Sequence, residues 1–305
     1  MHSRPAKTAT GPIAPIAVRA PRPAALIGVA LALAACGGSS PSPPPTASAR
    51  PSPAAGAAAP ALCGPLRARV IARVPVPGLK EASGLVLARG MLWTHDDSSG
   101  PAALFAISTR GKLLREVPVR GATNVDWEDI AARGDTLYVG DIGDNTGVRS
   151  GIVVYRVIPG HAAKAIALRY PDGPHDAEAL LVDSSGEMVI VTKNPTGESG
   201  VYSATGPGTL RKAGTLSLGL GETVTAGDVA GPTIVVRTYR RLYSWTRGRG
   251  EAIERALLRR PCRSDVSLLP EGQGESIALT RDGQSFYTLP EGPTPALRRY
   301  VVSGR

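Results

Sequence analysis

The chain has 305 residues, of which 42% are hydrophobic and 20% charged, and its 35 basic and 25 acidic side chains give a formal net charge of +10. Four of the basic residues and none of the acidic ones lie in residues 1–36, so the rest of the chain carries about +6 (10 minus 4). The remaining arginines are scattered rather than interleaved with stacking aromatic side chains, so we expect no nucleic-acid partner. Attraction to an anionic cell envelope fits this charge better.

The N-terminal segment has the pattern of an export signal. Basic residues precede an apolar run, AALIGVALALAA (24–35), which is too short to cross a bilayer as a stable helix. The run ends in the sequence LAAC at Cys36, which resembles the lipobox of bacterial lipoproteins. The resemblance implies a signal peptide at 1–35, cleavage before Cys36 and lipid on its sulfur. We therefore expect an extracytoplasmic protein anchored to the bacterial cell membrane through its N-terminal lipid.

The next segment is expected to be a spacer. Residues 37–61 are rich in Pro, Ser and Ala and cannot build a hydrophobic core. The predicted organisation is therefore a lipidated cysteine and linker at 36–62, followed by one folded domain at 63–305.

A short phrase recurs five times in that domain, as EASGL (81–85), DWEDIA (126–131), DAEALL (176–181), TAGDVA (225–230) and GESIAL (274–279). The apolar residues that anchor the phrases follow one another at steps of 45, 50, 49 and 48 residues and are Leu85, Ile130, Leu180, Val229 and Ile277. A period of this length with strand-like content is typical of a β-propeller, in which each repeat forms one four-stranded blade.

Further apolar runs, separated by Gly, Pro, Asp or Ser, follow each phrase. We expect second strands at 91–93, 136–140, 188–192, 233–239 and 285–289. Third strands are expected at 103–108, 152–157, 200–205, 241–246 and 296–302. Fourth, outermost strands are expected at 113–119, 165–170, 213–218 and 252–258, although the last of these, AIERALL, could form a helix instead.

The fifth repeat lacks a fourth strand of its own. The segment RVIARVPV (69–76) precedes the first phrase as LLREVPV (113–119) precedes the second. We expect this N-terminal strand to complete the last blade, which would close the ring and remove two free edges. The predicted fold is thus an all-β, five-bladed propeller closed by an N-terminal strand, with a six-bladed ring as the alternative.

Two cysteines remain once Cys36 is lipidated. Exported proteins usually pair such cysteines. Cys63 precedes the closing strand and Cys262 follows the last expected strand of the fourth blade. We predict a disulfide between them that pins the closure, and the alternative is two buried thiols.

Two positions before each anchor lies one recurrent slot, which holds Ser83, Glu128, Glu178, Gly227 and Glu275. In a propeller this slot recurs around the channel axis, so carboxylates should face one another. Carboxylates about 5 Å apart repel by roughly 3 kcal/mol per pair at an effective dielectric near 20. They must take up protons, pair with a cation or bind a metal. Oxygen ligands suit Ca²⁺, or alternatively Mg²⁺, better than Zn²⁺.

The predicted metal ligands are therefore Ser83, Glu128, Glu178 and Glu275. The alternatives are a channel filled by Lys193 or an arginine, and glutamates that turn into water. The face at which the phrases begin also collects polar residues from the ends of the second strands and the neighbouring loops, namely His95, Asp96, Asp97, Asp126, Asp141, Asp144, Asn145, His175, Asp176, Lys193, Asn194, Thr238, Tyr239 and Glu291.

The segments SGL (83–85), LWTHDDSSG (92–100) and DWEDIA, followed by LYVGDIGDN (137–145), resemble the first two blades of the calcium-activated nucleotidases, or soluble apyrases. The resemblance implies a five-bladed propeller with an axial calcium, held by serine and glutamate ligands at the slots named above. It also implies the Asp96–Asp97 pair as candidate catalytic acids.

The sequence departs from the nucleotidases at Gly227, where they have a serine for which Thr225 or Asp228 could substitute. The repeats equally resemble secreted bacterial propellers described as esterase-like or phytase-like, which leaves the substrate open.

Two functions follow from these patterns. The first is a binding or cell-envelope module with calcium as a structural axle, whose partner is an envelope polymer. The second is a calcium-dependent hydrolase of phosphate esters or nucleotides, acting on a phosphorylated small molecule. There Asp96, Asp97, Asp141 and Asp144 surround the metal and supply a base for water. In both cases we expect a monomer.

The histidines and large aromatic residues each allow two readings. His95 and His175 could hold a phosphate or a metal, but a loop histidine bonded to a neighbouring aspartate is the simpler interpretation. Trp93, Trp127 and Tyr138 are expected in blade packing rather than in a sugar-binding platform.

Overall fold

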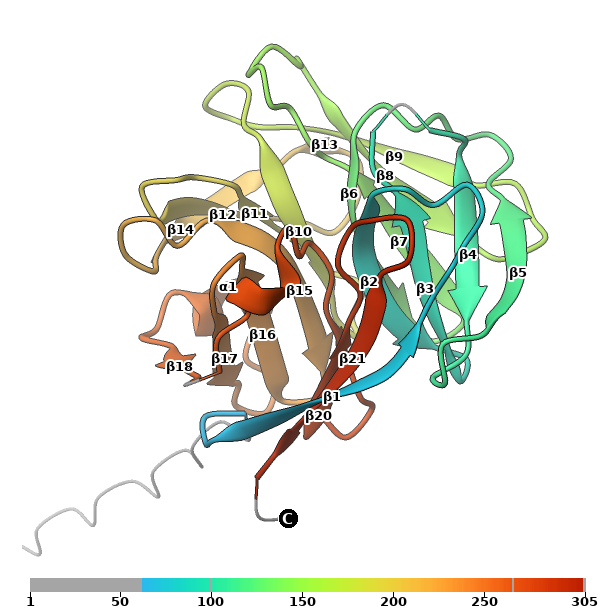
Figure 1. The fold of residues 1–305 in the computed structure, drawn as a ribbon. Helices are drawn as coiled ribbons and strands as arrows, with labels where there is room; N and C mark the ends of the chain where they lie inside the picture. Colours follow the sequence, from blue (N-terminus) through green and yellow to red (C-terminus); the bar gives the residue numbers. More distant parts are fainter. Residues whose placement is uncertain (1–61, 99, 265, 304–305) are drawn as a thin grey trace, which may run out of the picture. The chain divides into compact units, whose positions relative to one another are not determined.

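The computed structural model describes residues 62–98, 100–264 and 266–303 (Figure 1). The predicted signal peptide, Cys36 and nearly all of the linker lie outside these residues. Almost all regular secondary structure in the described part is β-strand, and the strands form five sheets, each of which is one antiparallel blade. The chain is thus a five-bladed β-propeller, as predicted, and the six-bladed alternative is wrong. Within these ranges, no helix is long and apolar enough to cross a membrane.

Each blade starts at the channel with an inner strand and continues outward. The inner strands are β2 (Ala82–Ala88), β6 (Trp127–Arg133), β10 (Ala177–Val182), β15 (Val224–Ala230) and β19 (Ala278–Leu279). The second strands are β3 (Met91–Asp96), β7 (Thr136–Asp141), β11 (Met188–Thr192), β16 (Thr233–Thr238) and β20 (Ser285–Thr288). The third strands are β4 (Ala103–Ile107), β8 (Ile152–Val157), β12 (Glu198–Ala204), β17 (Leu242–Thr246) and β21 (Ala296–Val302).

The outermost strands are β5 (Leu113–Pro118), β9 (Lys164–Arg169), β14 (Arg211–Ser217), β18 (Cys262–Arg263) and β1 (Leu66–Arg73). We number the blades 1 to 5 in the order of their inner strands. A short strand, β13 (Gly208–Thr209), leaves the blade 3 segment and pairs in parallel with β9 of blade 2.

The ring closes as expected. Strand β1, at the N-terminal end of the described chain, pairs antiparallel with β21 and completes blade 5 (Figure 1). Cys63 and Cys262 form a disulfide with a Cα–Cα distance of 5.6 Å. This bond joins the segment in front of β1 to β18 of blade 4, so it ties the closing strand to the neighbouring blade. The predicted disulfide is confirmed.

The prediction of a strand at 252–258 is wrong. This segment contains the helix α1 (Ile253–Leu257), and β18 is the outer strand of blade 4 instead. The buried residues Ile253, Ala256 and Leu257 recur at the spacing of one helical face. They pack against β12, β14 and β17, which allows a helix to cover the sheet edge there.

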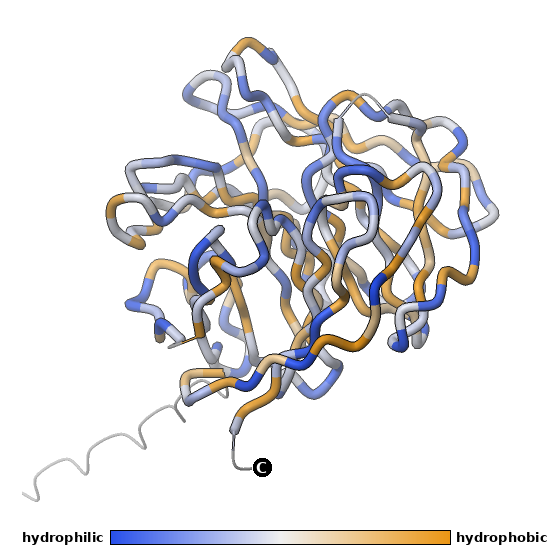
Figure 2. Tube along the Cα trace, viewed as in Figure 1, coloured by the Kyte–Doolittle hydropathy of each residue, from blue (hydrophilic) through white to orange (hydrophobic). Residues whose placement is uncertain are grey.

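The hydrophobic core lies between neighbouring blades. All six residues of β10 are buried, whereas the outer strand β5 has no buried residue and the outer strand β9 has one. Figure 2 shows hydrophobic residues mainly along the strands and hydrophilic residues mainly along the loops. Trp93 and Trp127 are completely buried and Tyr138 nearly so. These three aromatic residues serve blade packing, as expected.

Candidate functional site

A β-bulge aims one side chain of each of three inner strands at the channel. The pairing of the inner strand with the second strand shifts by one residue at Glu128 in blade 2, at Glu178 in blade 3 and at Thr225 in blade 4. A bulged residue leaves the regular in-and-out alternation of the strand, and bulges often redirect side chains next to functional sites. The bulges therefore place corresponding side chains at one depth of the channel.

The register corrects one slot. In blade 4 the residue that corresponds to Glu128 and Glu178 is Thr225, not Gly227. Thr225 is fully buried and its hydroxyl donates to the carbonyl oxygen of Gly274 at 2.9 Å. The sequence alignment on Val229 placed the channel-facing position of blade 4 two residues too far along the chain. Apolar residues lie on both sides of Thr225, so the apolar pattern does not fix the register. The hydrogen bonds between the strands place the bulge at Thr225.

Carboxylates from four blades meet at this end of the channel. We call them the axial carboxylate cluster, which consists of Asp97, Asp126, Glu128, Asp176, Glu178 and Glu275. Oxygens of Asp97, Glu128 and Glu275 lie within 4.8 Å of one another, and so do oxygens of Glu128, Asp176 and Glu178. The structure thus brings together the three glutamates chosen from the repeat, with Glu128 common to both groups.

Ser83 lies between two of these glutamates. Its hydroxyl donates to the carbonyl oxygen of Glu128 at 2.7 Å, and it forms a parallel bridge with Glu275. The hydroxyl oxygen keeps lone pairs for a cation. The next residue, Gly84, has a φ of 64°, and a Cβ there would lie 2.8 Å from the Cα of Asp129. Only glycine allows the chain to pass this close to blade 2.

The structure separates the four predicted catalytic acids, because only one of them lies in the axial carboxylate cluster. Asp97 joins the cluster, and its Oδ1 is buried without a hydrogen-bond partner among the described residues. Asp96 instead accepts the amide hydrogens of Lys80 and Glu81 at 2.8 and 2.9 Å. Its carboxylate holds the loop before β2.

Asp141 and Asp144 organise the loop after β7. Asp141 forms a 2.7 Å ion pair with Arg149. Asp144 accepts the amide hydrogens of Val148 and Arg149 at 3.0 and 2.8 Å, and its own amide donates to Asp176 at 2.8 Å. These two aspartates therefore position the loop and Asp176, rather than meeting the other carboxylates themselves.

Lys193 neutralises one side of the cluster. Its ammonium forms an ion pair with Oε1 of Glu178 and lies 4.0 Å from Oε1 of Glu275. The same oxygen of Glu275 accepts a hydrogen bond from the hydroxyl of Tyr239 at 2.5 Å. Burial by itself would lower the pKa of Lys193, but the Glu178 carboxylate outweighs it and raises that pKa. Lys193 accounts for a single positive charge beside six carboxylates.

Three carboxylates of the cluster resist ionisation. Burial, together with the charges of Glu275 and Asp126, raises the pKa of Asp97 to about 7. Burial and neighbouring carboxylates also raise the pKa values of Glu128 and Glu178 well above their ordinary range. Glu291, at the edge of the cluster, has its pKa raised to about 8 by burial and by a hydrogen bond with Glu275. These shifts have the direction expected where negative charge exceeds positive charge in a buried site.

The residues present fit a hard cation. All available ligands are oxygens, which Ca²⁺ and Mg²⁺ prefer. Oε2 of Glu178 is buried and lacks a partner within the described ranges, as Oδ1 of Asp97 does. A Cβ added to Gly143 would overlap the carboxylates of Glu128 and Asp126, so glycine leaves the space in which these groups approach one another.

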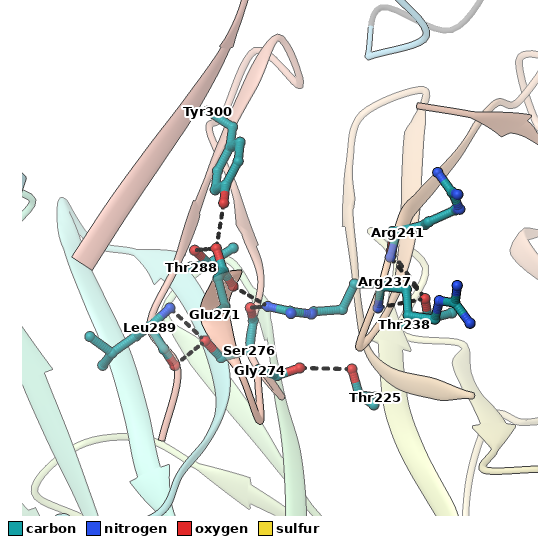
Figure 3. Close-up of polar contacts among 11 residues, drawn as sticks. Thr225, Arg237, Thr238, Arg241, Glu271, Gly274, Ser276, Thr288, Leu289 and Tyr300 are labelled. Carbon is teal, nitrogen blue, oxygen red and sulfur yellow. Dashed lines mark hydrogen bonds and ion pairs between the residues drawn. The ribbon is translucent and has the colours of Figure 1, made fainter. Parts of the chain in front are cut away.

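A buried network between blades 4 and 5 fixes the position of Glu275 (Figure 3). The fully buried Arg237 forms a 3.0 Å ion pair with Glu271 and donates to the carbonyl oxygen of Ser276 at 3.0 Å. Glu271 also accepts hydrogen bonds from Thr288 and Tyr300. Because Thr225 holds Gly274 and Arg237 holds Ser276, both neighbours of Glu275 are tied to blade 4.

Neither histidine on this face is placed as a ligand. His95 is fully buried, which lowers its pKa to about 4, and its Nδ1 lies 3.1 Å from the carbonyl oxygen of Asp96. His175 lies 3.0 Å from Asp172 and 2.9 Å from the hydroxyl of Tyr202. His175 therefore matches the simpler expectation of a loop histidine bonded to a nearby aspartate.

A cavity of about 580 Å³ lies on the opposite face between blades 3 and 4. Three charged residues of its lining are already paired, since Arg247 contacts Asp183 at 3.1 Å and Glu251 contacts Arg259 at 3.0 Å. The candidate site is therefore the axial carboxylate cluster, where charges remain uncompensated.

The sequence placed Asp126, Asp176, Tyr239 and Glu291 on the correct face but did not assign them to the site, whereas Lys193 was named as the alternative occupant of the channel and does lie beside Glu178 and Glu275. Tyr239 and Glu291 follow the second strands outside the recurrent slot, so the repeat spacing does not say how far their side chains reach. Asp176 could have been predicted from the sequence, because it lies two residues before Glu178, just as Asp126 lies two residues before Glu128.

No protein-family model matches the chain, and no curated protein matches it. Among solved structures, a putative gluconolactonase is similar over 78% of this chain and 92% of its own, with 12% identity and a TM-score of 0.45. The PQQ-bound aldose sugar dehydrogenase from Streptomyces coelicolor is similar over 78% and 98%, with 11% identity and a TM-score of 0.46. A nidogen/laminin complex contains a chain that is similar over 70% and 73%, with 13% identity and a TM-score of 0.46. Similarities this distant say nothing about the activity or ligand of this chain.

Proposed function

We propose that this protein is a lipid-anchored, extracytoplasmic β-propeller that binds a divalent cation, Ca²⁺ or Mg²⁺, at the axial carboxylate cluster and acts as a binding module of the cell envelope. The observation that carries the proposal is the meeting of buried carboxylates with unpartnered oxygens at one depth of the channel. Asp97, Glu128 and Glu275 would hold the ion, with the hydroxyl of Ser83 beside them.

We prefer the group of Asp97, Glu128 and Glu275 to the group of Glu128, Asp176 and Glu178, because Lys193 already forms an ion pair with Glu178. Buried carboxylates without compensating charge are costly, since each is removed from water while it repels its neighbours. A divalent cation would supply the missing positive charge. It would also join oxygens from blades 1, 2 and 5, which suits a structural axle.

The envelope role rests on the predicted lipid at Cys36 and on the ligand chemistry of the ion. A cation at the channel mouth with open coordination positions can bind the phosphate or carboxylate groups of an anionic envelope polymer. The lipid would hold the domain close to such a polymer.

Metal analysis tests the first part. The full chain is freed of metal with a chelator and then equilibrated with Ca²⁺ or Mg²⁺, and bound metal per chain is measured. Glu128→Gln should lose binding, whereas the matched change Glu116→Gln, on the exposed outer strand β5, should retain it. Failure of the unchanged protein to bind either ion would contradict the proposal. The envelope role is tested by sedimentation with isolated cell-wall polymer, which should require the cation.

A second function, metal-dependent hydrolysis of phosphate esters or nucleotides, is favoured by the position of Asp97. This residue is half-buried at the edge of the cluster, and its Oδ1, which has no hydrogen-bond partner among the described residues, could accept a proton from a water molecule that the cation polarises. The test is phosphate release from nucleotides and phosphate esters with and without Ca²⁺. Phosphate release that requires the cation would favour hydrolysis, whereas cation-dependent polymer binding without phosphate release would favour the binding module.

A further inference from the structure

We propose that the axial carboxylate cluster holds a second divalent cation, bound by Glu128, Asp176 and Glu178, so that Glu128 bridges two ions. This inference rests on the proposed function, because it adds a site next to the one formed by Asp97, Glu128 and Glu275.

The geometry of the second group matches that of the first. Its three carboxylates each bring an oxygen within 4.8 Å of the others. Glu128 and Glu178 are the bulged residues of adjacent blades and therefore reach the same depth. A carboxylate has two oxygens, so Glu128 can serve one cation with each. Paired metal sites typically place their ions about 3.5–4 Å apart, a distance that a bridging carboxylate spans.

An orphaned oxygen points to a ligand at this second group. Glu178 is only 1% exposed, and its Oε2 has no hydrogen-bond partner in the part of the chain that the structure describes. A buried acceptor without a partner is unfavourable, and more so when it is charged. Asp176 uses Oδ1 to accept the amide hydrogen of Asp144, and within the same ranges its Oδ2 accepts no hydrogen bond.

Lys193 does not occupy this position. Its ammonium contacts Oε1 of Glu178, which is the other oxygen of that carboxylate. Lys193 and a cation can therefore bind Glu178 at the same time, one on each oxygen. Arg149, the nearby guanidinium, is already paired with Asp141.

The balance of charge supports two ions. The cluster contains six carboxylates, and Lys193 together with one divalent cation would contribute three positive charges. A second divalent cation raises this to five, which nearly neutralises the site. The resulting centre consists of oxygen ligands only, which favours Ca²⁺ or Mg²⁺ over softer metals.

The number of ions bound per chain tests the proposal. The metal-free full chain is titrated with Ca²⁺ alone by calorimetry, and bound calcium is measured after equilibrium dialysis. We expect two ions per chain in the unchanged protein. Asp176→Asn and Asp97→Asn should each retain one ion, and Glu128→Gln should retain none. The control Asp135→Asn alters an exposed aspartate outside the cluster and should retain two.

The outcomes separate the two proposals. One ion per chain, unaffected by Asp176→Asn, would overturn the second site and leave the proposed function standing. No bound ion in the unchanged protein would overturn both.

Mn²⁺ provides a measurement that does not depend on variants, because two manganese ions bridged by a carboxylate couple magnetically. The electron paramagnetic resonance spectrum should show this coupling at saturation. A spectrum of isolated ions alone would overturn the bridge.

Discussion

The most informative perturbation is Glu128→Gln, because its effect on stability should depend on whether a divalent cation is present. Glu128 belongs to both carboxylate groups, so Asp97, Asp176, Glu178 and Glu275 each bring an oxygen within 4.8 Å of one of its own. At about 5 Å and an effective dielectric near 20, each ionised pair repels by roughly 3 kcal/mol. Four such pairs would cost about 12 kcal/mol, which approaches the whole stability of a typical domain of about 5–15 kcal/mol.

A cluster without cations must therefore bind protons, in agreement with the raised pKa of Glu128. Glutamine is neutral and has nearly the same shape. In excess chelator at neutral pH, Glu128→Gln should leave the melting temperature unchanged or raise it. In Ca²⁺ at about 100 times the dissociation constant, the unchanged protein gains about 2.7 kcal/mol for each bound ion. For a domain of this size, that gain corresponds to roughly 5–10 °C.

The Glu128→Gln variant lacks the carboxylate shared by both groups and should gain little of the stabilisation by Ca²⁺. In chelator, the two proteins should have similar melting temperatures, or the variant the higher one. In Ca²⁺, the unchanged protein should have the clearly higher melting temperature. Melting curves followed by circular dichroism in both conditions check the expectation, with Glu116→Gln as the matched control. If Glu128→Gln lowered the melting temperature equally with and without Ca²⁺, Glu128 would be a structural residue rather than a ligand.

Four further outcomes are expected. Burial raises the pKa of Asp228 from 3.8 to about 7, so its contribution to stability is fully present below about 3.8 and is lost as the pH rises through about 7. Asp228→Asn should therefore flatten the pH dependence of the unfolding free energy in that window, measured by urea titration. An unchanged slope would contradict this. Alkylation of the unfolded, non-reduced protein should find no free thiol at Cys63 or Cys262, and reduction should lower stability by about 2–5 kcal/mol. Arg237→Ala breaks a fully buried ion pair and should cost about 3–5 kcal/mol in chemical denaturation; a loss below about 1 kcal/mol would mean that blades 4 and 5 are joined by other contacts. Cys36→Ser should move the protein from the membrane to the soluble fraction with its propeller still folded, and retention of an uncleaved, membrane-bound form would show a different anchor.

Much of the architecture was predictable from the sequence, because a propeller repeats one local arrangement. The spacing of the five phrases placed the inner strands, and the absence of a fourth strand in the fifth repeat indicated closure by the N-terminal strand. The pairing of Cys63 with Cys262 followed from their positions beside that closure. Even the meeting of Glu128, Glu178 and Glu275 was predictable, since equal positions in a ring of repeats face one axis.

Tertiary structure decided the features that depend on register and reach. Whether Thr225 or Gly227 faces the channel depends on where hydrogen bonds place the bulge in β15, and the apolar pattern is compatible with both. The segment Ile253–Leu257 forms a helix because Ile253, Ala256 and Leu257 pack on a buried surface of blades 3 and 4, and the local pattern alone left strand and helix both open.

The composition of the site was likewise decided by contacts between loops. Asp96, Asp141 and Asp144 resembled Asp97 in sequence, but backbone amides and Arg149 engage them. Asp176, directly before β10, and Lys193, directly after β11, reach the cluster from the ends of their strands. The sequence by itself therefore determined the ring and the carboxylates that share its repeat, since both follow from periodicity. Only the three-dimensional arrangement decided which other charges join them, because that depends on distances between side chains remote in the chain.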